Sequence, residues 1–200
     1  LQLYFDFSGY ADMAIGLGLM FGIKLPANFR APYKSASIVE FWRRWHITLS
    51  SFLRDYLYIP LGGNRHGRLR ANVNLLITML LGGLWHGAGW QFILWGGVHG
   101  ALLVINHYWR HLSRWRLPRL LAVPLTLLVV MLAWIPFRAD SLSTSLRMFK
   151  GLADWRWSWS MDPALLLTEL ATMQIVKSLP VVCGLLLVVV LFAPSSRRLC

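Results

Sequence analysis

Long apolar runs dominate this chain, and short clusters of arginine separate them. Residues 1–23 are apolar apart from two aspartates, and further apolar runs occupy residues 120–137 and 179–194. A helix needs roughly 20 apolar residues to cross the hydrocarbon core of a bilayer, and these runs approach or reach that length. The pattern predicts a membrane-spanning helix at each place, with residues 138–178 on the extracytoplasmic side.

The longest apolar stretch, residues 73–106, is interrupted at its centre by the sequence WHGAGW (85–90). Basic loops at 62–72 and 107–119 flank it, and neither contains an acidic residue. Because basic loops of membrane proteins stay in the cytoplasm, we expect the stretch to enter the membrane and return, with WHGAGW at the turn. Each arm would then have only about 13 to 16 residues, which predicts a re-entrant or strongly tilted segment. One long tilted helix is the alternative.

Residues 39–57 show an amphipathic pattern. Trp42, Trp45 and Leu49 recur on one face at helical spacing, while charged side chains fall on the others. This pattern predicts one helix that ends at Pro60 and lies either at the membrane interface or against the bundle.

Composition supports a membrane protein and excludes several other classes. Hydrophobic residue types make up 56% of the 200 residues and charged types only 14%, against about a quarter in soluble domains. This composition excludes a disordered chain, a disulfide scaffold and an ordinary cytosolic enzyme. The net charge of +12 comes from arginines between apolar runs, a pattern more typical of polytopic membrane proteins than of nucleic-acid binding.

The predicted fold class is all-α: a polytopic integral membrane helical bundle with re-entrant and interfacial helices. Leu1 already lies in an apolar run with no basic segment before it, which argues against a signal peptide. We therefore expect the chain to be a fragment of a longer membrane protein, cut at both ends.

His86 stands at the centre of the longest apolar stretch, next to Trp85. An ionisable residue inside a membrane segment indicates a functional site, because burying a polar group without a partner costs roughly 2–7 kcal/mol. Desolvation favours the neutral imidazole, which can accept a proton. Four glycines within residues 82–89 are expected to let the backbone bend and a substrate approach. The alternative is a histidine that only donates to a carbonyl in helix packing.

His46 and two aspartates are further polar candidates. His46 falls at the border of the apolar stripe of residues 39–57, where it either meets His86 inside the bundle or reaches the lipid–water interface. Asp6 and Asp12 lie within the first apolar run, where pairing with arginines or the lining of a polar cavity would explain them.

Three blocks of the sequence carry a family resemblance: YFDFSGYADMAIGLGLMFGI (4–23), EFWRRWHITLSSFLRDYLYIPLGGNR (40–65) and GGLWHGAGWQFILWGGVHG (82–100). They closely resemble the membrane-bound O-acyltransferase family, and above all its bacterial branch, which includes the membrane subunits of alginate O-acetylation and of teichoic acid D-alanylation. The resemblance covers about residues 1–140, and residues 141–200 match only as a membrane tail. It implies that residues 1–200 are the C-terminal portion of a single acyltransferase domain.

The resemblance also implies roles for individual residues. The family's catalytic histidine, in its WHG block, falls on His86, and its second characteristic polar position falls on His46 within RRWH. The family elements EFWRRWH and DYLYIPLGG, here at 40–46 and 55–63, help to build the funnel around the site. The implied substrate-binding positions are Trp85, Trp45, Arg43, Arg44, Asp55 and Tyr56.

The activity implied by the resemblance is that of a multi-pass O-acyltransferase, most simply an O-acetyltransferase, of the bacterial inner membrane. The donor would be a cytoplasmic acyl thioester, either acetyl-coenzyme A or an acyl-carrier protein. The acceptor would be a hydroxyl of an extracytoplasmic polysaccharide such as alginate, or a periplasmic relay protein. His86 would abstract the hydroxyl proton, and His46 would orient the acceptor or stabilise the oxyanion. No tightly bound cofactor, metal or nucleic acid is implied, and membrane lipid is the surrounding partner.

Two other classes fit parts of the pattern. A transporter or exporter subunit for polysaccharide or lipid, with His86 lining the pathway, would share the broken helices and buried acids. Such transporters often show an internal repeat, and we find none in this sequence. A structural scaffold would use His86 only for packing and should tolerate His86→Gln.

Overall fold

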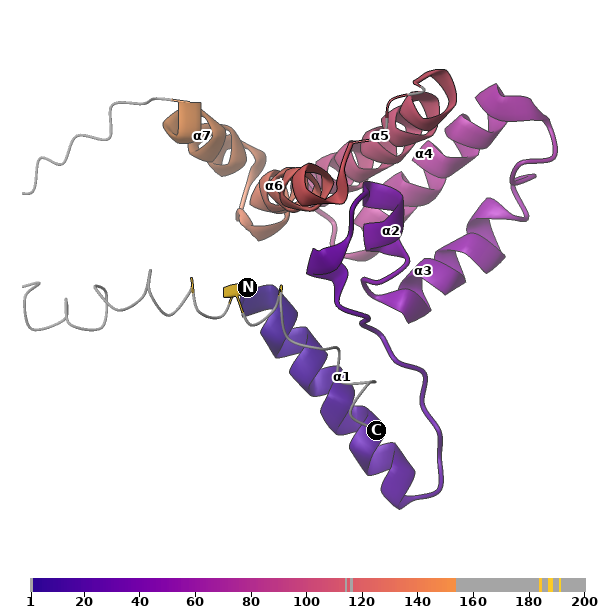
Figure 1. Cartoon of the computed structure of the whole chain (residues 1–200), viewed down its shortest axis with the longest axis vertical. Helices are drawn as coiled ribbons and strands as arrows, with labels where there is room; N and C mark the ends of the chain where they lie inside the picture. Colours follow the sequence, from indigo (N-terminus) through magenta and orange to yellow (C-terminus); the bar gives the residue numbers. More distant parts are fainter. Residues whose placement is uncertain are drawn as a thin grey trace, which may run out of the picture.

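The computed structural model describes residues 2–113, 115, 117–153, 184, 187, 188 and 191, and every regular element among them is helical. The all-α prediction is therefore confirmed for this part of the chain (Figure 1). In chain order the elements are α1 (Gln2–Met20), the 3-10 helix η1 (Pro32–Lys34), α2 (Ile38–Trp42), α3 (Ile47–Leu53), the π-helical turn η2 (Arg54–Tyr58), α4 (Gly67–Trp85), α5 (Trp90–Leu112), α6 (Arg119–Arg138) and α7 (Leu142–Ala153).

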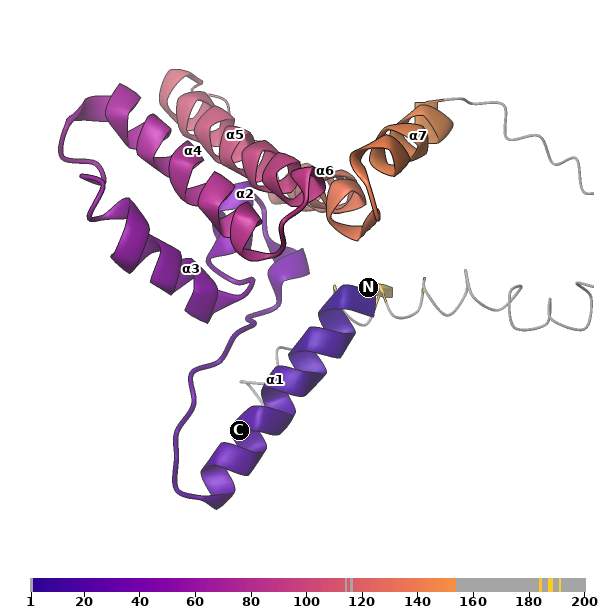
Figure 2. The ribbon, with the colours of Figure 1, turned by 180° about the vertical axis from the view of Figure 1, so that it is seen from behind.

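Helices α4 and α5 form an antiparallel hairpin and lie side by side in both Figure 1 and Figure 2. Arg68, near the start of α4, contacts His111 near the end of α5. At the other end of the hairpin, a Cβ atom added to Gly83 would meet the backbone of Phe92. Residues 86–89 make the turn between the two helices. The predicted return path with WHGAGW at its turn is thus confirmed, and the single long helix is wrong.

The arms of this hairpin are longer than the sequence predicted. Helices α4 and α5 have 19 and 23 residues, because both continue through the basic segments that were expected to be loops. Arginine has a good helix propensity, and its long side chain reaches water from a helix end, so a cluster of arginines does not end a helix. At 1.5 Å per residue the shorter arm is about 28 Å long, close to the thickness of a hydrocarbon core.

The single amphipathic helix predicted at residues 39–57 is wrong. The structure instead has two short helices, α2 and α3, followed by η2. Two backbone hydrogen bonds of 3.0 Å join the break between α2 and α3 to an earlier loop, from the Arg30 N–H to the Arg44 carbonyl and from the Ile47 N–H to the Asn28 carbonyl. These bonds occupy groups that a continuous helix would have paired within itself.

Helix α6 confirms the apolar run at 120–137 as a helix. Among the described helices it is the one that is both long and apolar enough to cross a membrane. The predicted span at 179–194 falls outside the described residues, apart from single helical positions such as residue 184.

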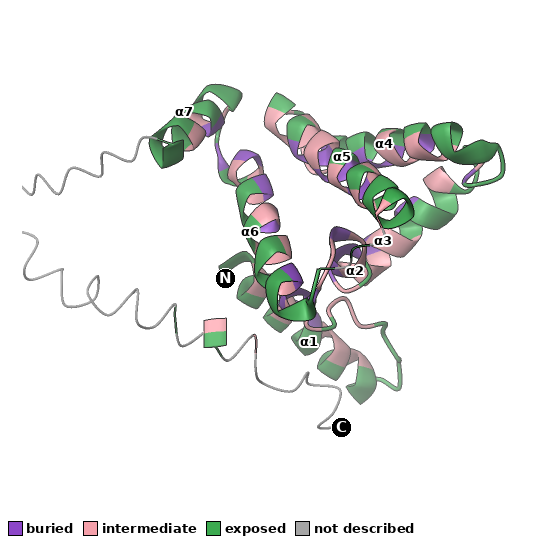
Figure 3. Cartoon of the chain, turned by 45° about the horizontal axis from the view of Figure 1, so that its top comes forward, coloured by how far each residue is buried: buried purple, intermediate pink, exposed green. Residues whose placement is uncertain are grey.

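Helix α1 lies apart from the other helices and joins them through a long extended segment (Figure 1). Its first half contacts the rest of the protein through Tyr4 and Phe7, while most residues of its second half are exposed (Figure 3). Asp6 and Asp12 are exposed as well, and neither forms an ion pair within the described residues. The predicted pairing of these two aspartates with arginines is therefore not found within the described residues.

The core is mainly aromatic and lies where α2, the hairpin and α6 meet. Phe41, Trp42 and Trp45 project from α2 and the segment after it, and they pack with Trp95 of α5 and Trp134 of α6. Aromatic pairs of this kind add about 0.5–1.5 kcal/mol each beyond the area that they bury. The core therefore fixes α2 and the following segment against the hairpin turn, where the candidate histidines lie.

Candidate active site

A small cavity of about 50 Å³ holds both predicted catalytic histidines, His46 and His86, in its wall. The two histidines come from segments that are 40 positions apart in sequence, and the aromatic core brings them together. The other lining side chains are apolar or aromatic: Leu3, Phe7, Trp42, Trp45, Leu49, Trp95, Trp134 and Phe137. The imidazoles are thus the main polar groups that face this space.

His86 ends α4 and begins the hairpin turn. Its backbone N–H donates to the Gly83 carbonyl at 3.0 Å, as in a closing helical turn. Its ring is half-buried and meets Trp95 and Phe137 edge to face, with centroids 5.1 Å apart in each case. Two rigid aromatic rings therefore hold the imidazole at the cavity.

His46 has a strained backbone. Its φ and ψ of 43° and 56° lie in the left-handed region, which few residues other than glycine adopt. Such strain costs about 1–3 kcal/mol and is concentrated at functional sites. The His46 ring packs on Phe7 with a centroid distance of 4.7 Å, and its Nδ1 is buried without a hydrogen-bond partner in the described structure. An unpaired ring nitrogen beside a cavity is available to a bound substrate.

Of the four glycines expected to let the backbone bend, Gly87 and Gly89 lie in the turn, whereas Gly82 and Gly83 lie within α4 and serve helix packing. Gly83 and Gly96 lie where α4 and α5 cross, and a Cβ atom on either would overlap the backbone of the opposite helix. Gly82 packs against the Leu53 side chain of α3. These glycines let three helices approach closely, and their backbones are helical, so they do not supply the bend itself.

The structure places the six predicted substrate-binding residues in different environments. Trp45 is buried and lines the histidine cavity. Trp85 is 66% exposed, with its ring centroid 5.0 Å from that of His86. The other four do not line this cavity: Arg43, Arg44, Asp55 and Tyr56.

Three of those four have local partners. Arg44 pairs with Glu40 at 2.6 Å, one turn earlier on the chain. Asp55 accepts from Arg54 at 2.7 Å, and this hydrogen bond lowers the pKa of the Asp55 carboxyl below its ordinary value. Tyr56 stacks on Phe52 on the exposed side of η2. Their roles toward a substrate stay predictions.

His99 is a residue that the sequence analysis missed. Its side chain has no exposed surface, and the Trp42 Nε1–H donates to its Nδ1 at 3.3 Å. Its ring centroid is 4.9 Å from that of Trp95, which in turn contacts His86. His99 therefore supports two aromatic walls of the cavity from behind. The only available signal was its position four residues after Trp95, one helical turn away on the same face.

No metal centre is formed by the described residues, since no three or more His, Cys, Asp or Glu side chains come together in them.

Comparison with known proteins shows which family this chain is similar to. Residues 1–138 match the model of the membrane-bound O-acyltransferase family. The chain belongs to this family. The membership places it among membrane-bound proteins and agrees with the resemblance carried by the three sequence blocks.

Three relatives show how similar this chain is to known proteins over the parts that align. The peptidoglycan O-acetyltransferase of Helicobacter pylori is 54% identical over 154 residues, 76% of this chain and 29% of its own length. A probable alginate O-acetylase, AlgI, of Azotobacter vinelandii is 51% identical over 175 residues, 86% of this chain and 35% of its own length. A teichoic acid D-alanyltransferase of Bacillus subtilis is 32% identical over 125 residues, 58% of this chain and 32% of its own length. The chain thus spans about a third of the length of these relatives.

Proposed function

We propose that the intact protein is a membrane O-acyltransferase that moves an acetyl group from a cytoplasmic thioester to a hydroxyl of an extracytoplasmic polysaccharide. The observation that carries this proposal is the shared cavity of His46 and His86, at the turn of the α4–α5 hairpin. The names of the relatives support it, because they include acetyl transfer to alginate and to peptidoglycan.

The residues fit a general-base mechanism. Neutral His86 takes the proton from the acceptor hydroxyl as its oxygen attacks the thioester carbonyl carbon. The tetrahedral intermediate then collapses, the carbon–sulfur bond breaks, and the proton on His86 passes to the departing thiolate. His46, as a neutral imidazole, donates its ring N–H to the acceptor oxygen or the oxyanion. The products are an ester and a free thiol, so no other reactant is required.

The size of the cavity favours a small acyl group. Its volume of about 50 Å³ has room for the centres of roughly three to five water-sized groups, each of which needs about 10–15 Å³. An acetyl group fits this space, whereas a long acyl chain would need to displace the aromatic walls. This is the structural reason for proposing acetyl.

The proposal extends to the setting of the site. Residues 1–200 would form the C-terminal portion of one acyltransferase domain in a multi-pass protein of the inner membrane. The donor would be acetyl-coenzyme A or an acetylated carrier protein, reaching the site from the face that carries the basic helix ends. The acceptor would be the polysaccharide itself or a periplasmic protein that relays the acetyl group.

The test uses the intact protein in its own host. We would compare ester-linked acetyl on the surface polysaccharide for the wild type, His86→Ala and His46→Ala, with membrane levels measured by immunoblot. Loss of the base should lower acetylation by at least about 100-fold, and loss of His46 by up to about 100-fold through poorer positioning. His66→Ala is the matched control, because His66 is exposed and lies outside the cavity.

Two results would overturn the proposal. Normal acetylation by His86→Ala at a normal membrane level would remove His86 as the base. Disappearance of the polysaccharide from the surface, with acetylation of the remaining polymer unchanged, would favour the transporter alternative.

A further inference from the structure

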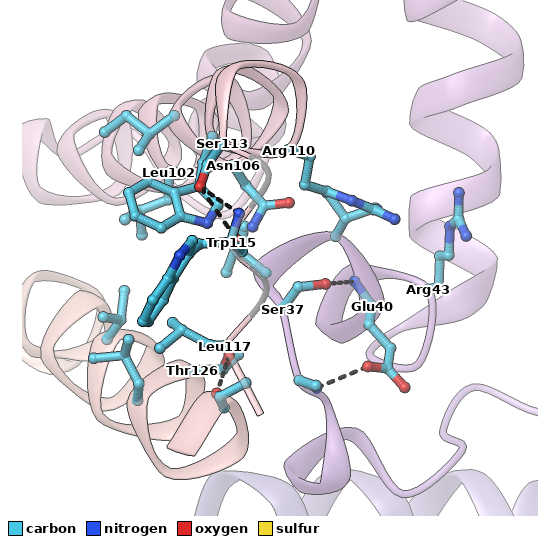
Figure 4. Close-up of a pocket in the computed structure, with 18 residues that line it drawn as sticks. Ser37, Glu40, Arg43, Leu102, Asn106, Arg110, Ser113, Trp115, Leu117 and Thr126 are labelled. Atoms are coloured by element: carbon cyan, nitrogen blue, oxygen red, sulfur yellow. Dashed lines mark hydrogen bonds between the residues drawn. The ribbon is translucent and has the colours of Figure 1, made fainter. Parts of the chain in front are cut away.

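A second, larger cavity of about 740 Å³ lies between α2, the end of α5 and the first half of α6 (Figure 4). It shares no lining residue with the cavity of the two histidines. Helix α2 lies between the two cavities: its Ile38 and Val39 line the larger cavity, and its Trp42 lines the histidine cavity. Its volume is within the range of about 300–1,000 Å³ that is typical of small-molecule sites. The mechanism proposed above places no reacting group in this cavity.

The floor of the larger cavity is apolar. Leu102 and Ile105 of α5 face Leu125 and Val129 of α6 across it. An apolar slot between two helices that lie in or near a membrane is suited to a hydrocarbon chain, since no polar group on the floor would need to be satisfied.

The rim of the same cavity is basic. Arg43 and Arg110 line it, both are exposed, and neither forms an ion pair within the described residues. Figure 4 shows the Arg110 side chain extending from α5 toward the side of α2 that carries Arg43. Two unpaired guanidinium groups above an apolar slot complement an anionic headgroup above an acyl chain.

The acidic group on the rim, Glu40, does not cancel this charge. Its carboxylate already pairs with Arg44 at 2.6 Å and lies 3.9 Å from Arg119, and it accepts from the backbone N–H of Ala36 at 2.7 Å. Because these groups satisfy Glu40, the guanidiniums of the rim face an incoming anion unopposed.

Two further features point to a lipid with hydrogen-bonding groups in its head. Asn106 lines the cavity, and its Oδ1 atom is buried without a hydrogen-bond partner in the described structure, so it lacks a donor. Trp109 and Trp115 flank the opening with exposed rings, and tryptophan is the residue that concentrates at the level of lipid headgroups. A headgroup hydroxyl would satisfy Asn106 while a phosphate meets the arginines.

We propose that this cavity is a binding site for one anionic glycerophospholipid with a hydroxylated headgroup, such as phosphatidylglycerol. The phosphate lies between Arg43 and Arg110, a headgroup hydroxyl donates to Asn106, and an acyl chain occupies the slot between α5 and α6. The bound lipid fills the space between α2 and α6, and α2 also forms a wall of the histidine cavity. The residues that support this lipid site do so whether or not the proposed acyl transfer is correct.

The test is lipid retention by the purified intact protein, measured by native mass spectrometry. The protein is stripped of lipid in detergent and then offered equal amounts of phosphatidylglycerol and phosphatidylcholine. We expect one phosphatidylglycerol to bind in preference to phosphatidylcholine. Each of Arg43→Ala and Arg110→Ala should weaken binding about fivefold, and the double variant roughly 25-fold, as expected for one favourable charge contact per arginine.

Two controls separate the site from general charge attraction. Arg70→Ala removes an exposed arginine of α4 that does not line the cavity, and it should leave binding unchanged. Leu125→Trp narrows the slot at an exposed position of α6 without altering charge, and it should reduce binding. Equal retention of both lipids, equal effects of Arg70→Ala and Arg43→Ala, or displacement of the lipid by coenzyme A at similar concentration would overturn the proposal.

Discussion

At the scale of single residues, the buried contacts behind the cavity matter as much as the histidines in front of it. The bond from Trp42 to His99 is buried and joins α2 to α5. Breaking such a bond leaves a polar atom unsatisfied in the core, which costs about 1–3 kcal/mol, whereas removing both partners is nearly neutral apart from packing. His99 is thus expected to act on the site by positioning Trp42 and Trp95.

A double-mutant cycle tests this role of His99. We expect His99→Leu and Trp42→Phe each to lower the thermal unfolding temperature of the detergent-purified protein, and the double variant to lose less than the sum. The coupling should be about 1 kcal/mol, the typical net value of one hydrogen bond. The matched control combines Trp134→Phe with His99→Leu, because Trp134 forms no hydrogen bond with His99 in the described structure. The stability losses of these two variants should add up in the double variant. Additive losses for the Trp42 pair as well would show that the bond is unimportant.

At the scale of helices, the α4–α5 hairpin depends on two glycines that face each other. A Cβ atom on Gly96 would overlap the Met79 carbonyl, and one on Gly83 would overlap the Phe92 carbonyl. Neither backbone can move without separating the two helices, so the clash cannot be relieved by a side-chain rotation. The turn that carries His86 is positioned by this close contact.

Gly97, the residue after Gly96, provides the control for a test of this close helix contact. Gly96→Ala should destabilise the protein by about 1–3 kcal/mol through overpacking. Gly97→Ala should be neutral or stabilising by up to about 1 kcal/mol, since alanine is the better helix former and the nearest atom there is the flexible end of Leu80, at 3.4 Å. Thermal unfolding and membrane abundance measure both variants. Similar behaviour of the two would contradict the close-contact interpretation.

The sequence predicted those features of the helices that depend on local pattern. The hairpin and α6 follow from apolar runs and from the position of WHGAGW, and the structure confirms both. The break between α2 and α3 depends on hydrogen bonds to Asn28 and Arg30, far back in the chain, so no periodicity within residues 39–57 reveals it. His99 was missed for the same reason, because its partner Trp42 lies 57 positions away.

At the scale of the whole molecule, the two ends of the hairpin differ in charge, and this difference predicts how the hairpin is oriented across the membrane. The basic ends of α4 and α5 lie together, as the contact of Arg68 with His111 shows, and the turn at 86–89 lies at the other end. An arm of about 28 Å is long enough to separate these ends by a hydrocarbon core. The histidine cavity beside the turn would then lie away from the basic face, and the donor would have to reach inward to it.

Cysteine labelling tests this arrangement in sealed vesicles of the intact protein, after its native cysteines, Cys183 and Cys200 among them, have been replaced by serine. Leu69→Cys and Ala88→Cys place a thiol at exposed positions near the two ends of α4. An impermeant maleimide should label Leu69→Cys in inside-out vesicles, because the positive ends stay cytoplasmic, and Ala88→Cys in right-side-out vesicles. Detergent-opened vesicles, in which both thiols should react, control for accessibility. If both thiols react from the cytoplasmic face, the hairpin is re-entrant, and the acceptor rather than the donor must travel to reach His86.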